Sequence, residues 1–137
     1  MISIKKSKFV KARKGRLYGV ENKANFLVIG DFGLKSISSQ RIKEYQIEAM
    51  RKFLVKKIRK NDKFWLRIFP FLSVTSKPIE TRMGKGKGNI SSYFFPLKAG
   101  RVIFEFQGIS LKAALDLSIS INSKLPIKAK LIKLYDN

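Results

Sequence analysis

The segment EYQIEAMRKFLVKKIRKNDKFWLRIF, residues 44–69, places a helix pattern directly before a strand pattern. From Glu44 to Lys60 apolar residues recur at steps of three and four, which predicts an amphipathic helix with a basic outer face; they are Ile47, Met50, Phe53 or Leu54, and Ile58. Asn61-Asp62 predicts a turn. From Lys63 to Phe69 the pattern alternates, with Phe64, Leu66 and Ile68 on one face of a strand that Pro70 ends.

Shorter patterns on both sides of this segment predict further strands. Residues 18–37 contain short apolar stretches, notably 26–29, broken by Gly30 and Gly33, which predicts strands joined by turns. Residues 93–98 and 101–106 read as two strands joined at Ala99-Gly100 in a hairpin. Pro96 cannot donate a ladder hydrogen bond, so its strand is expected to be an edge or to begin later.

The C-terminal part predicts a second helix and a last strand. Ser110 is a candidate N-cap for a helix reaching about Lys124, and Leu125-Pro126 stops it. Its expected apolar side consists of Leu111, Ala114, Leu115, Leu117, Ile119 and Ile121. Residues 127–135 alternate as a closing strand. The prediction is one α+β domain over 18–137, a mainly antiparallel sheet with two helices, preceded by an extended basic arm at 1–17 and carrying a protruding internal loop at 78–92.

The charge of the chain indicates a polyanionic partner. Lysine and arginine total 30 against 9 acidic residues, for a net charge of +21 in 137 residues. A compact monomer with that charge repels itself and associates with nucleic acid or an anionic surface. The composition, 45% hydrophobic, is sufficient for a single core. No apolar run reaches the roughly 18 residues of a membrane span, and no secretory signal is visible, so a soluble protein without a membrane segment is expected.

The absence of histidine and cysteine excludes several classes of enzyme. Ser-His-Asp and Cys-His catalysis, thiol redox chemistry, disulfides and Cys/His zinc sites all require those residues. The carboxylates are scattered among lysines and are interpreted as surface ion-pair partners and helix-end charges; they include Glu44, Glu48, Asp62, Glu80, Glu105 and Asp116. We therefore predict no catalytic residue, metal ligand or cofactor. The alternative is a free-standing basic RNA-processing or RNA-modifying enzyme.

Three basic segments are the candidate nucleic-acid contacts. The arm supplies Lys6, Lys8, Lys11, Arg13, Lys14 and Arg16, and the first helix supplies Arg51, Lys52 and Lys56. The internal loop supplies Arg82, Met83, Gly84, Lys85, Gly86, Lys87 and Gly88, in which glycine allows close backbone approach and the cations suit phosphate. Each segment has an alternative reading as a solvated tail, helix face or surface loop. Trp65 is similarly open between core packing, which is favoured, and stacking on a base.

The order of these motifs resembles the bacterial-type large-subunit ribosomal protein sixteen family. The matching blocks span nearly the whole chain: Lys8-Phe9 through Lys14-Gly15-Arg16, residues 30–35, residues 46–49 with Arg51, residues 65–70, Lys77-Pro78 with residues 80–88, residues 100–102 with Phe104-Glu105, and residues 124–128. Ordered agreement over this many blocks is far more specific than the glycine-lysine loop alone.

The resemblance implies a structural ribosomal protein without enzymatic activity. Members of the family bind large-subunit rRNA near the aminoacyl-tRNA site, beside other large-subunit proteins, and extend this loop towards the peptidyl transferase centre. Arg82, Lys85 and Lys87 would then contact the rRNA or tRNA backbone, and the three glycines would allow a thin path. Such contacts fix position and read little sequence.

The chain departs from the family pattern at Lys43, which replaces a threonine cap, at Phe71-Leu72, and at residues 91–96. Its frequent Ile, Lys, Phe, Asn and Ser indicate AT-rich coding. The expected location is the mitochondrial matrix, in a mitochondrial ribosome encoded by the organelle; the alternative is the cytoplasm of an AT-rich bacterium.

Overall fold

The computed structural model describes residues 11–134, which form two helices and seven strands. The elements in chain order are β1 (Phe32–Ser36), β2 (Gln40–Lys43), α1 (Glu44–Lys57), β3 (Lys63–Leu66), β4 (Leu72–Ser76), β5 (Asn89–Leu97), β6 (Val102–Gln107), α2 (Leu111–Asn122) and β7 (Ala129–Lys133). All strand pairs between named elements are antiparallel. The predicted α+β class, with two helices and antiparallel sheet, is confirmed.

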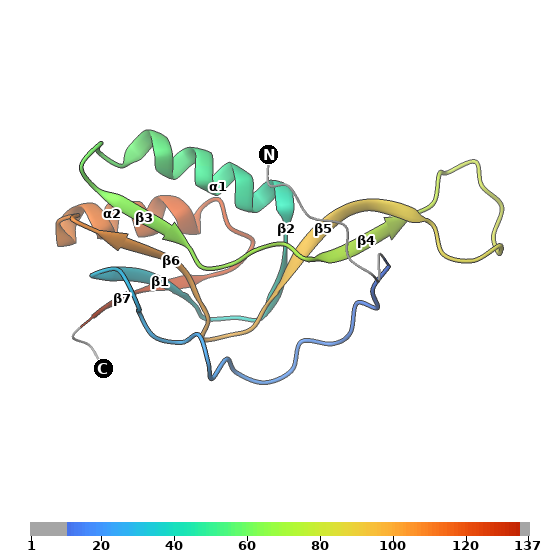
Figure 1. Ribbon diagram of the computed structural model, residues 1–137, viewed down its shortest axis with the longest axis horizontal. Coiled ribbons are helices and arrows are strands. Elements are labelled where there is room, and N and C mark those ends of the chain that lie inside the picture. The colour runs from blue at the N-terminus through green and yellow to red at the C-terminus, as the bar shows by residue number, and fades with distance from the viewer. Residues whose placement is uncertain (1–10, 135–137) are drawn as a thin grey trace.

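The strands form two sheets rather than one (Figure 1). The larger has the order β3-β6-β1-β7, and the smaller has the order β2-β5-β4. The predicted hairpin of residues 93–98 and 101–106 is therefore wrong, because β5 and β6 belong to different sheets. Their turn, with Gly100 at φ +88°, is held against the end of β1 by the bond from the Gly100 amide to the Ser36 carbonyl, 2.8 Å.

Strand β5 begins at Asn89 instead of Tyr93 and is the middle strand of its sheet. Pairing with β4 extends only to Phe94, whereas pairing with β2 covers Phe94 to Leu97. At Pro96 the strand thus has one neighbour and is locally an edge. This explains how a residue without an amide hydrogen fits inside a strand that is central overall.

The main core lies between both sheets and the two helices. From α1 it receives Ile47, Met50 and Leu54, all at most 1% exposed, and Phe53 and Ile58 pack against it, as the helix pattern predicted. From α2 the buried residues are Ala114, Leu117, Ser118 and Ile121. Leu111, Leu115 and Ile119 are exposed, so half of the predicted apolar side of this helix was wrong.

The ends of the helices follow their side-chain chemistry. Ser110 caps α2 as predicted, its Oγ accepting from the Ala113 amide at 3.3 Å. At α1 the N-cap is Lys43, whose side chain has no acceptor. Gln46 supplies the other half of a capping box, because its Oε1 accepts from the Lys43 amide at 2.9 Å. The helix ends at Lys57 rather than Lys60, since Ile58 is extended.

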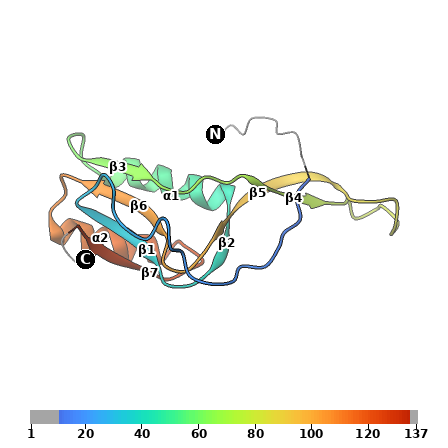
Figure 2. The same cartoon turned by 60° about the horizontal axis from the view of Figure 1, so that its bottom comes forward.

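Residues 26–29 do not form the predicted strand. They belong to a segment that crosses the face of the larger sheet opposite the helices, with Leu27 buried and Phe26, Val28 and Ile29 exposed. Gly30 then passes close to β6: a Cβ there would lie 2.6 Å from the Phe106 carbonyl oxygen. Figure 2 shows this segment in front of β1 and β6.

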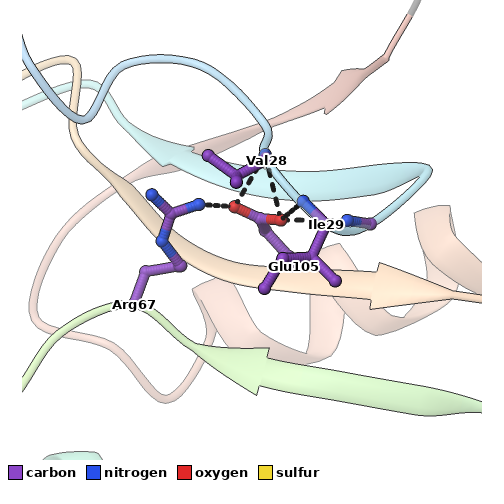
Figure 3. Close-up of polar contacts among 5 residues, drawn as sticks. Val28, Ile29, Arg67 and Glu105 are labelled. Carbon is purple, nitrogen blue, oxygen red and sulfur yellow. Dashed lines mark hydrogen bonds and ion pairs between the residues drawn. The ribbon is translucent and has the colours of Figure 1, made fainter.

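The carboxylate that holds this segment is Glu105, which was predicted to lie at the surface. Its side chain is fully buried, so that prediction is wrong. The carboxylate accepts from the amides of Val28, Ile29 and Gly30, with distances to Oε2 of 3.2, 2.7 and 2.9 Å, and from the Arg67 guanidinium (Figure 3). Burial is tolerated because every side of the charge has a donor.

Trp65 lies beside Glu105 in register on β3 and is partly buried. The predicted alternation of two faces is confirmed. Ile68 belongs to the core and Phe64 and Leu66 pack against it, whereas Arg67, on the other face, contacts Glu105. The strand itself is shorter than predicted and ends at Leu66.

Candidate nucleic-acid interface

The glycine-lysine loop lies at the far end of the long axis of the molecule (Figures 1 and 2). Strands β4 and β5 pair from Leu72 with Phe94 to Ser76 with Asn89, so the connection between them is residues 77–88. Residues 89–92, which were predicted to belong to the loop, are part of β5. Every residue from 77 to 87 is exposed, and Met83 is 96% exposed. Arg82 and Lys85 therefore present their charges to the surroundings, while the exposed Lys87 contacts the arm at the base of the loop.

The loop tip follows a left-handed backbone path. Gly84, Lys85 and Gly86 have φ values of +93°, +55° and +80°, and no neighbouring atom would obstruct a Cβ at either glycine. Lys85 is the one non-glycine residue with positive φ among residues 11–134. Lys77 at the base of the loop donates to the Gly84 carbonyl, and this hydrogen bond links the base of the loop to its tip. The glycines are thus required by conformation rather than by packing.

The base of the loop meets the arm. The Lys11 ammonium donates to the Lys87 carbonyl at 3.1 Å, and the Lys87 ammonium donates to the Ala12 carbonyl at 2.7 Å. The Ala12 amide also donates to Ser73 Oγ of β4 at 3.2 Å. Gly88 packs closely against the end of β4, because a Cβ at this position would lie 2.3 Å from the Ser76 carbonyl oxygen. Two of the three predicted basic segments are therefore adjacent.

The rest of the arm runs from the loop base along the smaller sheet. Arg13, Lys14 and Arg16 are exposed, and residues 11–19 contain neither helix nor strand. Arg41 of β2 donates to the Gly15 carbonyl at 2.6 Å, and Arg16 donates to the Tyr18 hydroxyl at 2.8 Å. Lys6 and Lys8, also predicted as contacts, lie outside the described residues.

The α1 cations are separated from this surface. Lys52 and Lys56 are exposed on a helix that lies along the opposite side of Figure 1 from the arm. Arg51 makes a double contact with Glu48, with Nε to Oε2 at 3.1 Å and Nη2 to Oε1 at 2.9 Å. The hydrogen bond from Arg51 is the main reason that the pKa of Glu48 is lowered, and the same bond raises the pKa of Arg51. The charge of Arg51 is consequently balanced in part by Glu48 within the same helix.

Residues 18–24, between the arm and β1, are fixed by Arg101. Its guanidinium donates to Glu21 at 2.9 Å and lies 4.9 Å from the centre of the Phe95 ring. Burial raises the pKa of Glu21, but the hydrogen bonds from Arg101 and the Lys23 amide and the nearby positive charges more than offset this, so the pKa is lowered overall. The backbone is also held, because the Glu21 amide donates to the Ala99 carbonyl at 2.8 Å.

Sequence reasoning missed three residues of this surface: Tyr18, Arg41 and Lys77. Lys77 was noted only as the residue that opens the loop. Arg41 and Tyr18 stand in segments whose patterns concern strands and turns, and nothing local in the sequence brings them together. Arg16 and Tyr18 are two positions apart in the sequence, whereas the contact of Arg41 in β2 with the Phe94 ring in β5, at 5.7 Å, is visible only in the folded chain.

Within residues 11–134 no cluster of three or more acidic side chains could hold a metal ion. No helix in the same range is long and apolar enough to cross a membrane.

Comparison with known proteins gives consistent matches over the full chain. The profile of the family "Ribosomal protein L16p/L10e" matches residues 4–132. Proteins named large ribosomal subunit protein uL16 are similar throughout: that of Orientia tsutsugamushi (strain Boryong) is 40% identical over 99% of this chain and 100% of its own length. The uL16 of Leptospira biflexa (strain Patoc 1 / Ames) is 41% identical over 97% of both chains, and that of Rhodopseudomonas palustris (strain BisA53) is 42% identical over 96% of both.

Proposed function

The chain belongs to the ribosomal protein L16p/L10e family, and we propose that its arm and loop form one continuous surface for large-subunit rRNA. Membership makes the chain a structural component of the large ribosomal subunit, with rRNA and other ribosomal proteins as its partners, and not an enzyme. The alternative of a free-standing RNA-processing or RNA-modifying enzyme is thereby overturned.

The observation that carries the proposal is the junction of Lys11, Ala12 and Lys87. It makes the described part of the arm, which begins at Lys11, a neighbour of the loop, residues 77–88, at the base of the loop. The phosphate contacts would come from Lys6, Lys8, Lys11, Arg13, Lys14 and Arg16 of the arm and from the loop cations. Lys52, Lys56 and, more weakly, Arg51 would contact a second stretch of rRNA, because α1 faces elsewhere.

For the loop we propose contact with tRNA in the aminoacyl site near the peptidyl transferase centre. Arg82 and Lys85 are exposed on a projecting loop and contribute nothing to the core, and Met83 between them is 96% exposed. Gly84 and Gly86 keep the tip narrow. Mobile cations on a thin backbone suit a place where RNA passes and must also leave, since contacts to phosphate are sequence-independent.

We also propose a mitochondrial ribosome as the location, on the composition of the chain. The relatives named above are bacterial proteins, which matches the alternative, a bacterial cytoplasm. Fractionation of the source cells decides between them: the protein is expected with mitochondrial rather than cytoplasmic large subunits.

Sedimentation of the native protein tests the ribosomal assignment. We expect it to migrate with the large subunit even in high salt, because a built-in component is also held by contacts that salt does not screen. A casually bound basic protein is held mainly by phosphate contacts, which weaken steeply as salt rises. Release at moderate salt, at the same point as a casually bound basic protein, would show that the chain is not a built-in component.

A further inference from the structure

We propose that the hollow between the arm and β2 binds one unpaired ribonucleotide, with the base stacked on Tyr18 and the phosphate held by Arg16 and Arg41. This inference rests on the proposed binding of rRNA and adds a specific site to it. The hollow is open, measures about 510 Å³, and is lined by Arg16, Leu17, Tyr18, Ser39, Gln40 and Arg41. Its volume is within the range of small-ligand sites.

The charge of this hollow favours a phosphate. Two guanidinium groups line it and no carboxylate does. A second hollow, between the end of α1 and the start of α2, has Asp62 and Asp116 beside Lys57 and Arg59, which disfavours an anion there. Arg41 uses one of its donors on the Gly15 carbonyl at 2.6 Å, which fixes the guanidinium and leaves its other donors for a ligand.

The aromatic ring favours a base that is not stacked on other bases. Tyr18 is 67% exposed although it is large and apolar, and its hydroxyl accepts from Arg16 at 2.8 Å, which sets the ring and the cation side by side. Bases inside an A-form helix are covered on both faces by their neighbours, whereas bases of loops and single strands can stack on aromatic side chains. Gln40, on the rim of the hollow, offers an amide to the edge of such a base.

Binding of the full-length chain to two labelled RNAs, a 12-nucleotide oligouridylate and a 12-base-pair duplex, tests the site by fluorescence anisotropy over a range of salt. Tyr18→Ala is expected to weaken binding of the single strand by about fivefold or more at every salt concentration, since the ring on which one base stacks is removed. The slope of log affinity against log salt should stay unchanged, and duplex binding should stay within about twofold of wild type.

Three further variants make the result specific. Tyr18→Phe keeps the ring and should bind like wild type. Tyr45→Ala removes a tyrosine of similar exposure, 60%, on α1 outside the hollow, and should also bind like wild type. The double variant Arg16→Ala, Arg41→Ala should make the slope shallower by about 0.7 for each phosphate of the single strand that is no longer neutralised. Thermal unfolding of Tyr18→Ala should match wild type, because the side chain is mostly exposed.

The outcomes separate this site from the broader proposal. If wild type binds both RNAs and Tyr18→Ala binds the single strand normally, or loses duplex binding equally, the nucleotide site is wrong while rRNA binding stands. A Tyr18→Phe variant as weak as Tyr18→Ala also overturns the stacking role. If wild type binds neither RNA, the proposed rRNA surface and the site fall together.

Discussion

At the scale of single residues, Glu105 determines where the chain runs before β1. Its buried carboxylate gathers three consecutive backbone amides and the Arg67 guanidinium, which ties residues 28–30 to the middle of the larger sheet. Backbone donors that would pair in a strand are used by this side chain instead. The amides of residues 28–30 therefore donate to the Glu105 side chain and not to the backbone of a neighbouring strand.

Removing Arg67 should therefore be costly. Arg67→Ala leaves a buried carboxylate without its ion-pair partner, and we expect a loss of about 3 kcal/mol in the free energy of unfolding, measured with urea. Arg59→Ala is the control, because Arg59 is exposed just beyond α1, and should change stability by less than about 0.5 kcal/mol. Equal effects of the two substitutions would show that the pair does not hold the segment.

The Glu21 interaction with Arg101 should appear in the pH dependence of stability. Because the pKa of Glu21 is lowered in the folded state, its stabilisation is present above the unfolded-state pKa, near 4.5, and is lost as the pH falls through the folded-state value. Glu21→Gln should thus be less stable than wild type near pH 7 and differ little from it near pH 3, in urea unfolding at both. A difference of the same size at both pH values would contradict this.

At the scale of elements, the arm is predicted to supply part of the electrostatic affinity. Replacing Lys11, Arg13 and Arg16 together by Ala should make the slope of log affinity on log salt shallower, by about 0.7 for each phosphate of single-stranded rRNA that the arm no longer neutralises. The matched control removes three exposed lysines from α2 and the β7 region, Lys112, Lys128 and Lys130, at equal cost in net charge. Filter binding with an rRNA fragment measures both, and identical slopes for the two variants would show that the arm binds no phosphate locally.

Elements set by local patterns could be predicted from sequence, and elements set by distant partners could not. The apolar periodicity of α1 and the cap at Ser110 are local signals, and both helices appear where they indicated. The pairing of β5 and β6 depends on strands elsewhere in the chain, so two strands separated by a good turn looked like a hairpin. In α2 every apolar position looked equally buried, because the pattern does not tell which side faces β7.

The same distinction holds for the candidate site. The glycine-lysine pattern identified the loop, and its tip has the left-handed backbone that glycine favours. Sequence could not show that Lys11 and Lys87, 76 positions apart, each donate to the other's segment. The pairing of Glu48 with Arg51, by contrast, is a local helix pattern that sequence could have indicated. It also could not place Tyr18 beside Arg41, since their proximity depends on the path of the arm across β2.

At the scale of the whole molecule, the loop cations lie far from the helices, at the end of a projection. Both helices and the larger sheet lie toward one end of the long axis in Figure 1, and strands β4 and β5 carry the loop to the other end. A net charge of +21 opposes folding through self-repulsion, and binding to rRNA would relieve it. Substitutions in the loop are therefore expected to leave folding largely unchanged, since residues 77–87 are exposed and lie outside the core.

The binding of aminoacyl-tRNA by ribosomes that carry the triple variant Arg82→Ala, Lys85→Ala, Lys87→Ala tests the central claim most directly. The three side chains are exposed, so we expect thermal unfolding of the free protein to change only slightly, by about 0.5 kcal/mol or less per substitution. Purified ribosomes with the variant should assemble and yet bind aminoacyl-tRNA more weakly than ribosomes with the Lys112, Lys128, Lys130 control. Normal tRNA binding by variant ribosomes, together with an unfolded free protein, would show that the loop is structural and that its cations do not serve the aminoacyl site.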